Sequence, residues 1–144
     1  MNPIVIQRSV SAAGVPAPAT LRTFARAALG RLNGELTLRV VGAAESRALN
    51  KRYRGKDKPT NVLSFPATAS PGERRVGDLV LCAPVVASEA RAQNKSAQAH
   101  WAHLVVHGCL HLLGHNHEVE AEAVEMEAKE RKILKRLGFP DPYA

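Results

Sequence analysis

The segment His100–Leu113 limits the possible folds more than any other stretch, because its residues are apolar on nearly every side apart from the histidines. A helix with this pattern is buried on most of its faces rather than along a single stripe. Gly114 follows directly and provides a stop for such a helix. We therefore expect a helix that lies inside the molecule and is covered by other elements.

The other elements follow from the spacing of apolar residues, which repeats every three or four positions in helices and every second position in strands. The predicted strands span Ile4–Arg8, Glu35–Val41, Asn61–Phe65 and Val76–Cys82, and the predicted helices span Leu21–Leu32, Ala43–Arg54, Pro84–Gln93 and Glu118–Leu137. This order of strands and helices predicts an α+β fold. We expect a single domain over residues 1–144, with one mixed sheet of about four strands covered by about five helices.

Two of these helices carry a more specific expectation. Leu32 completes the apolar face of the helix over residues 21–32. In the last helix, six glutamates occupy the first two-thirds and basic residues occupy the end, which is the order that complements the helix dipole. We expect these glutamates to form a solvated face.

Length and composition narrow the class of protein. The chain has 144 residues, which is a usual size for one domain. No stretch approaches the roughly 20 apolar residues of a membrane-spanning helix, and the first residues lack the pattern of a secretory signal. Two cysteines, Cys82 and Cys109, are too few for a disulfide-based secreted domain, so we expect both to be small core residues. These features predict a soluble cytoplasmic protein without a membrane partner.

Positive charge is concentrated in one part of the chain. Residues 1–99 carry 15 basic and six acidic side chains, whereas residues 100–144 carry five basic and seven acidic ones. Between residues 47 and 58 the basic residues are Arg47, Lys51, Arg52, Arg54, Lys56 and Lys58. Such a stretch can follow a phosphate backbone, and Tyr53 offers a ring on which a base can stack. The alternative is a helix end followed by a solvated basic loop that binds nothing.

The histidines form a second cluster, because all six fall within 18 residues. His107 and His111 are four residues apart, so their imidazoles lie on one helix face and can converge on one ion. The turn after the helix can bring His117 back over this face as a third ligand. Three neutral imidazoles and a water molecule form an open tetrahedral zinc site. His103, His107 and His111 are a rival ligand set.

Gly108 separates this cluster from a familiar peptidase motif. That motif has a glutamate after its first histidine as general base, and Gly108 occupies this position after His107. The sequence alone therefore names no base. If the basic stretch lies on the same side of the molecule as the imidazoles, a zinc site beside it favours phosphodiester cleavage in single-stranded nucleic acid.

Three blocks of the sequence resemble the YbeY family, which are bacterial endoribonucleases described as maturing ribosomal RNA. The blocks are Leu49–Pro66 (LNKRYRGKDKPTNVLSFP), Gly77-Asp78-Leu79, and His107–His117 (HGCLHLLGHNH). They occur in the family's order, and the resemblance as a whole covers about residues 35–137. The resemblance implies that His107, His111 and His117 bind one zinc ion. It also implies that Arg54 is required for activity, where it would hold a phosphate or stabilise the charge that develops on it.

The resemblance further implies a substrate and partners. It predicts a zinc-dependent endoribonuclease of single-stranded RNA that acts in 3′-end maturation of small-subunit ribosomal RNA and in ribosome quality control. Ribosomal or small-subunit proteins would be its partners. The remaining basic residues of the stretch that we expect to bind RNA are Lys51, Arg52, Lys56 and Lys58.

Two positions depart from the family pattern, and both change a carboxylate into an amide. Asn61 and Asn116 stand where the family usually has aspartate. An aspartate beside a zinc-binding histidine can orient the imidazole or act as a base, whereas asparagine can only orient it. If either aspartate normally carries a proton, we expect slower cleavage by this chain, and if the aspartates only shape the turn, we expect little change.

Two other functions are compatible with the same residues. The zinc can be structural, in which case the protein is a non-catalytic binder in ribosome assembly. The zinc can also serve the hydrolysis of peptides or small molecules, although Gly108 and the basic charge of residues 1–99 count against this function.

Overall fold

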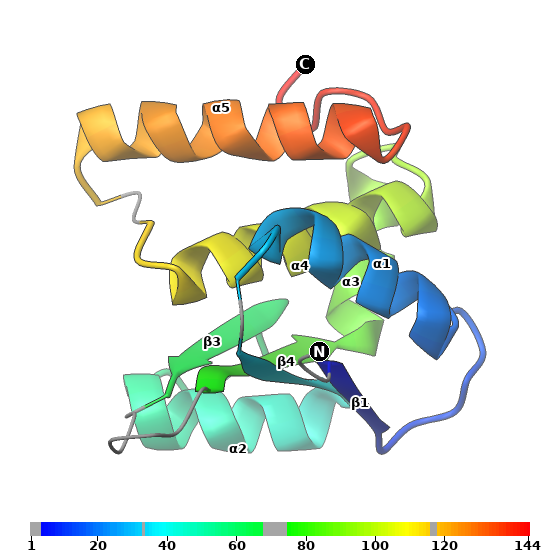
Figure 1. The fold of residues 1–144 in the computed structure, drawn as a ribbon. Coiled ribbons are helices and arrows are strands. Elements are labelled where there is room, and N and C mark those ends of the chain that lie inside the picture. The colour runs from blue at the N-terminus through cyan, green and yellow to red at the C-terminus, as the bar shows by residue number, and fades with distance from the viewer. Residues whose placement is uncertain (1–3, 33, 68–74, 116–117) are drawn as a thin grey trace.

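The structure is a computed structural model and describes residues 4–32, 34–67, 75–115 and 118–144. Its strands are β1 (Ile4–Arg8), β2 (Glu35–Val41), β3 (Val62–Pro66) and β4 (Arg75–Cys82). Its helices are α1 (Pro18–Leu29), α2 (Ala43–Arg54), α3 (Ala83–Ala92), α4 (Ala97–Leu112) and α5 (Glu120–Arg136), as Figure 1 shows. Four strands and five helices in the described residues confirm the predicted α+β fold.

The strands form one mixed sheet in the order β1-β2-β4-β3. β1 and β4 both run parallel to β2, whereas β3 runs antiparallel to β4 at one edge. Alternate residues of β2 (Leu36, Leu38 and Val40) are fully buried in the main core. This alternation follows from the period of two in a strand, which sends successive side chains to opposite faces.

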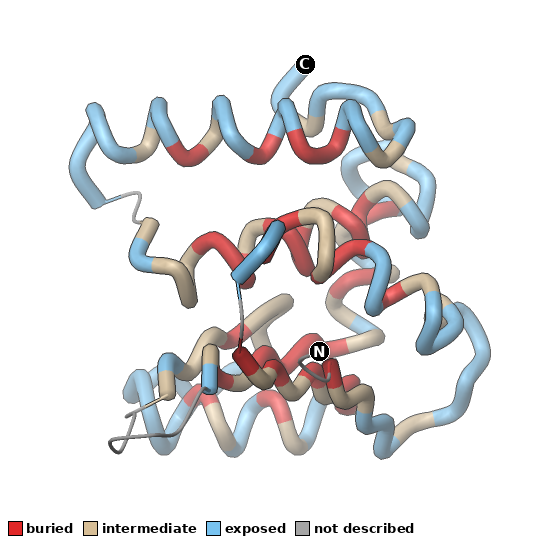
Figure 2. The backbone as a smooth tube through the Cα atoms, viewed as in Figure 1, coloured by how far each residue is buried: buried red, intermediate tan, exposed pale blue. Residues whose placement is uncertain are grey.

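Helices cover both faces of the sheet. α2 lies against one face, α1 and α4 lie over the other, and α5 lies beyond α4 (Figure 1). A small core of Val41, Leu63 and Val80 lies apart from the main cluster. The buried residues of α5 face α4 (Figure 2). The result is a layered molecule in which α4 is an inner helix.

Helix α4 confirms the prediction drawn from its apolar sequence. It packs against β3 and β4 on one side and against α1, α3 and α5 on others. Nine of its residues are buried, among them Trp101 and Val105. It begins at Ala97, three residues before the predicted start, because the Ser96 hydroxyl accepts a hydrogen bond from the backbone N–H of Ala99 and caps the helix.

The end of α1 differs from the prediction. The helix stops at Leu29, because Gly30 has a φ of 60° and turns the chain away. Leu32 is therefore not on the apolar face and is 42% exposed. The expectation for the two cysteines is confirmed, since Cys82 and Cys109 are both fully buried. Burial raises the pKa of the Cys109 thiol to about 12, so this thiol stays protonated at neutral pH.

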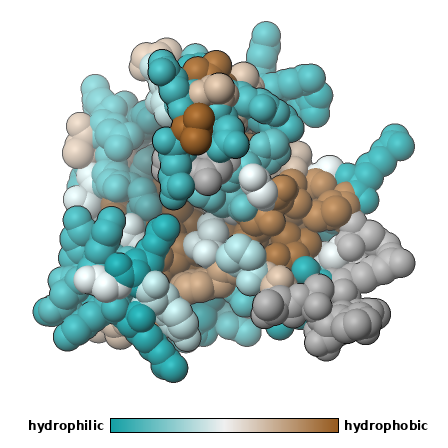
Figure 3. Space-filling view, turned by 90° about the vertical axis from the view of Figure 1, so that its left-hand side faces the viewer, coloured by the Kyte–Doolittle hydropathy of each residue, from teal (hydrophilic) through white to brown (hydrophobic). Residues whose placement is uncertain are grey.

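The surface is mostly hydrophilic at one end of the molecule (Figure 3). Within the described residues, no helix combines the length and the apolar character needed to cross a membrane. Figure 3 shows the end of the molecule at which α4 stops. Hydrophilic side chains cover most of this face, and apolar ones gather beside the residues drawn in grey.

Candidate functional site

A cleft of about 890 Å³ runs beside α4 and is lined by residues from four parts of the chain. α4 contributes His100, His103, His107 and His111, whose spacing of three, four and four residues places them along one helix face. The rings of His107 and His111 lie with their centroids 5.2 Å apart and at 80° to each other. The prediction that these two imidazoles share a face is therefore confirmed.

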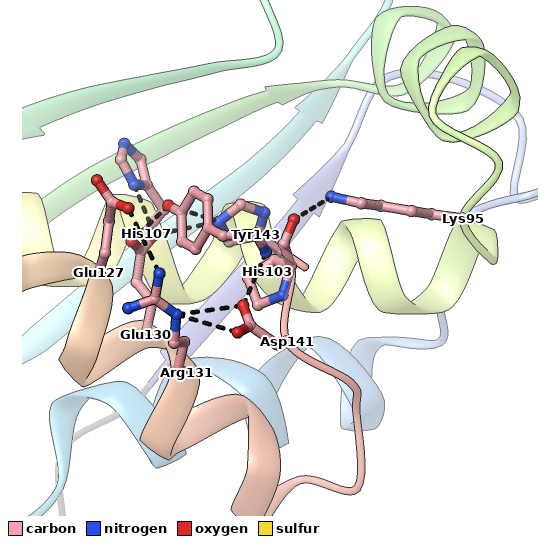
Figure 4. A network of polar contacts seen from close by, with 9 residues as sticks. Lys95, His103, His107, Glu127, Glu130, Arg131, Asp141 and Tyr143 are labelled. Atoms are coloured by element: carbon pink, nitrogen blue, oxygen red, sulfur yellow. Dashed lines mark hydrogen bonds and ion pairs between the residues drawn. The ribbon is translucent and has the colours of Figure 1, made fainter.

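His107 is held by a carboxylate from a different helix. Its Nδ1 atom lies 2.7 Å from Oε1 of Glu130 on α5, and Figure 4 shows the two side chains pointing toward each other between the helices. His107 is about a quarter exposed, whereas the Glu130 side chain is completely buried. An ionised carboxylate accepts hydrogen bonds only, so Nδ1 carries the ring proton and donates the hydrogen bond to Glu130.

Glu130 has two further donors. The Nε2 atom of His103 lies 3.2 Å from Oε1, and the hydroxyl of Tyr143 donates to Oε2 at 2.7 Å. Burial alone would raise the pKa of Glu130, but the hydrogen bonds from His103 and His107 outweigh it and lower the pKa to about 2. Burial and the Glu130 carboxylate raise the pKa of Tyr143 far above its usual range. The network therefore joins an ionised carboxylate to a protonated phenol.

The burial of Glu130 corrects the expectation of a solvated glutamate face on the last helix. Glu130 lies four residues after Met126 and three and four residues before Ile133 and Leu134, and all four are buried. These positions share one side of α5, the side that packs on α4. A charged residue on the apolar face of a helix is the signal that could have identified Glu130 from sequence.

Tyr143 was also not identified from the sequence as a site residue, and no local sequence pattern indicates this role. It lies in the tail that follows α5 and lines the cleft together with Pro142. Asp141 pairs with Arg131 at 3.1 Å, and the Lys95 ammonium donates to the Pro142 carbonyl at 2.8 Å. Figure 4 shows this tail lying along α5 with the tyrosine ring turned toward the histidines.

A second polar cluster lies further along the cleft, around Glu89 of α3. The Nε2 atom of His100 lies 2.9 Å from Oε1 of Glu89, and the amide of Asn61 donates to both oxygens at 3.1 and 3.3 Å. The side-chain oxygen of Asn61 accepts from the backbone N–H of Val62 at 2.6 Å. Asn61 therefore acts here as a donor to a carboxylate, a role that an ionised aspartate cannot fill.

Part of the basic stretch lies at the same cleft. Arg54 and Lys56 line it together with His107 and His111, so the condition that the charges and the imidazoles share one side is met for these two residues. Among the described residues, no hydrogen bond or ion pair involves the Arg54 side chain. Its guanidinium is therefore available to an anion. Tyr53 also lines the cleft and is 56% exposed.

The other predicted RNA-binding residues do not line the cleft. Lys51 lies 4.0 Å from Asp57 at the surface. The guanidinium of Arg52 lies over the Tyr53 ring, 5.3 Å from its centroid. Lys58 accepts a hydrogen bond from Asn50 through its backbone carbonyl. The binding of RNA by these three residues stays a prediction.

The packing of α4 against the sheet requires a small residue at Gly108. A Cβ atom at this position would lie 2.7 Å from Cδ2 of Leu79 on β4 and 3.3 Å from Cγ2 of Val62 on β3. The glycine therefore lets α4 approach the sheet closely, and its carbonyl accepts a hydrogen bond from Ser64 at 3.4 Å. The glutamate of the peptidase motif has no room here.

The chemistry of these donors fits a metal ion. His103, His107 and Glu130 offer ligand atoms that all lie within 4.8 Å of one another, so this group could hold an ion. The same contacts are also the pattern in which a carboxylate orients a metal-binding histidine through the opposite ring nitrogen. His117, the predicted third ligand, and Asn116 lie outside the described residues.

Comparisons with known proteins agree on one family. A family model described as Endoribonuclease YbeY matches residues 17–138. A protein named Endoribonuclease YbeY from Halorhodospira halophila is 61% identical over 115 residues, which cover 76% of this chain and 75% of that protein. The solution structure of TM1509 from Thermotoga maritima is similar with a TM-score of 0.66 and 25% identity, covering 95% of this chain and 89% of that one.

Proposed function

The chain belongs to the YbeY endoribonuclease family, and from this premise we propose that it is a zinc-dependent endoribonuclease that cleaves single-stranded RNA. Its substrate is ribosomal RNA, chiefly the 3′ end of the small-subunit RNA, and it works in the cytoplasm with ribosomal proteins as partners. The observation that carries the proposal is that Arg54 lines the same cleft as His107 and His111.

The proposed ligands of the zinc ion are His107, His111 and His117. Because Nδ1 of His107 is bound to Glu130, Nε2 is the nitrogen with which this ring would bind the ion. The oxygens of Glu130 already accept three hydrogen bonds inside the core. An ion bound by Glu130 itself would have to displace these hydrogen bonds, which favours the three histidines as the ligands. When bound, zinc supplies a Lewis acid and lowers the pKa of a coordinated water.

Arg54 has the chemistry of a phosphate-binding residue. A guanidinium matches two phosphate oxygens with parallel hydrogen bonds, and no other described residue forms a hydrogen bond or ion pair with the Arg54 side chain. We propose that it holds the phosphate to be cleaved and stabilises the charge that develops on it. Lys56 extends the positive charge along the cleft, while Lys51, Arg52 and Lys58 would guide the strand from outside it.

The opening of the cleft favours catalysis over a structural ion. His107 and His111 line a space large enough to admit substrate, whereas structural zinc sites are closed by four protein ligands. A non-catalytic role in ribosome assembly would leave the zinc in place and produce no cleavage. Hydrolysis of peptides would not need Arg54 and Lys56 at the cleft.

The test combines metal content with RNA cleavage. Purified protein is incubated with labelled single-stranded RNA, with the same RNA annealed to its complement, and with a peptide library, each with and without a chelator. We expect chelator-sensitive cleavage of the single strand only. Replacing His111 by Ala should remove zinc and cleavage together. His115→Ala is the matched control, since His115 contacts Lys129 and does not line the cleft. Full cleavage by metal-free His111→Ala would overturn the proposal.

A further inference from the structure

We propose that Glu130 and Tyr143 are positioning residues of the metal site: Glu130 fixes the ring of His107, and Tyr143 fixes Glu130. The segment after α5 that carries Tyr143 is then part of the metal site. This inference rests on the proposed function, because it takes His107 as a metal ligand. It concerns residues that contribute no ligand atom of their own.

The first step is the proton on His107. Oε1 of the buried Glu130 carboxylate accepts hydrogen bonds from two histidines, so the short contact of 2.7 Å places the proton of a neutral His107 ring on Nδ1. The lone pair is then on Nε2, the nitrogen that a metal needs. Without the carboxylate, the proton would distribute between both nitrogens and the ring could turn. Glu130 therefore selects the tautomer and the orientation.

The second step is the position of Glu130 itself. Its side chain has no exposure to solvent, so each of its oxygens needs a donor from the protein. The two histidines bond to Oε1, and among the described residues the Tyr143 hydroxyl is the one donor that bonds to Oε2, at 2.7 Å. Removal of this hydroxyl leaves Oε2 unsatisfied inside the core, and the carboxylate would rotate away from His107.

The third step is the anchoring of Tyr143. Its ring meets the ring of His103 edge to face with centroids 5.4 Å apart, and its backbone N–H donates to Asp141 at 2.8 Å. Asp141 is paired with Arg131, whose guanidinium also lies 5.2 Å from the centre of the tyrosine ring. Side chains of α4 and α5 therefore both contact the Tyr143 ring, as Figure 4 shows.

The experiment measures the affinity of the full chain for Zn²⁺ alone, by competition with a chelator of known affinity. Glu130→Gln keeps the shape of the side chain and removes its charge, and we expect the affinity to fall about 10- to 100-fold. Tyr143→Phe keeps the ring and removes only the hydroxyl, and a fall of about 3- to 10-fold is expected. Glu125→Gln makes the same chemical change on the exposed side of α5 and should have no effect.

A second measurement does not depend on metal or on activity. Nitrogen NMR of the imidazoles in metal-free protein reports which nitrogen of His107 carries the proton. The unmodified chain and Glu125→Gln should show the proton on Nδ1, and Glu130→Gln should show a mixture. If Glu130→Gln folds poorly, the zinc affinity and the His107 tautomer of Tyr143→Phe test the inference. Unchanged zinc affinity and an unchanged His107 tautomer in that variant would overturn the inference.

The design separates this inference from the proposed function. If His111→Ala retains zinc, the proposed ligand set is wrong and the inference falls with it. If His111→Ala loses zinc while Glu130→Gln and Tyr143→Phe bind it as tightly as the unmodified chain, only the positioning role is refuted.

Discussion

Nδ1 of His107 and Oε1 of Glu130 lie 2.7 Å apart, although the two residues are 23 positions apart in the sequence. The contact places an ionised group in the interface between α4 and α5, on the same buried side of α5 as Met126 and Leu134. A buried charge is not an efficient way to stabilise a helix pair, because its desolvation opposes the attraction to its partners. Its presence is better explained by what it does to the histidine.

The first prediction concerns pH. The folded state lowers the pKa of Glu130 from 4.5 to about 2, so its contribution to stability is present above about pH 4.5 and is lost as the pH falls toward 2. Between about pH 5.5 and pH 3, the free energy of unfolding should fall by about 2 kcal/mol more in the metal-free unmodified chain than in Glu130→Gln. Urea titrations of both proteins across this range measure the difference. Parallel curves would show that Glu130 is not held in its ionised form.

The second prediction concerns Arg54. Arg54→Ala should leave zinc content unchanged and reduce single-strand RNA cleavage about 100-fold, because one charge-stabilising donor is lost. Arg54→Lys should recover only part of the rate, since an ammonium cannot form two parallel hydrogen bonds. Arg136→Ala removes an exposed arginine away from the cleft and serves as the control. Equal cleavage by Arg54→Ala and Arg136→Ala would remove Arg54 from the proposed mechanism.

The third prediction concerns the contact between α4 and the sheet. Gly108→Ala would place a Cβ atom 2.7 Å from Cδ2 of the buried Leu79. Overpacking costs about 1–3 kcal/mol and the better helix propensity of alanine returns about 1 kcal/mol, so we expect a net loss of about 1 kcal/mol in urea unfolding. Leu79→Val removes the methyl group concerned, and Gly108→Ala should cost less in that background. If Gly108→Ala lowers the free energy of unfolding equally in the unmodified chain and in Leu79→Val, the strain does not come from the contact with Leu79.

Most of the fold could be predicted because the signals are local. The alternation in β2 and the all-round apolar pattern of α4 each lie within one element and report directly on burial. The same holds for His107 and His111, which share a face because of helix geometry alone. The shorter α1 was missed because a single residue, Gly30, overrides the apolar periodicity that continues to Leu32.

The rest of the site depends on contacts between distant parts of the chain. Nothing near Glu130 in the sequence shows that His107 lies opposite, and Tyr143 reaches the site only because Asp141 and Lys95 hold the tail. The presence of Arg54 at the same cleft results from the packing of α2, β3 and α4 around it. The family resemblance could suggest that Arg54 and the histidines act together, whereas their positions around one cleft can be seen only in the folded chain.

The fourth prediction concerns Asn61, where the family usually has aspartate. Its amide donates to both oxygens of Glu89, which also binds His100. Asn61→Asp replaces this donor with a second carboxylate, so the free energy of unfolding at pH 7 should fall by about 1–2 kcal/mol. Glu89→Gln in the same chain supplies an amide that can donate to the new aspartate.

The double variant Asn61→Asp with Glu89→Gln should therefore regain most of the stability that Asn61→Asp loses. A double-mutant cycle from urea unfolding measures this coupling, for which we expect at least about 1 kcal/mol. If the two substitutions are simply additive, the amide of Asn61 does not bind Glu89 in solution. A positive coupling would show that asparagine is matched to its neighbour in this chain, so that restoring the family's aspartate alone weakens the fold beside the cleft.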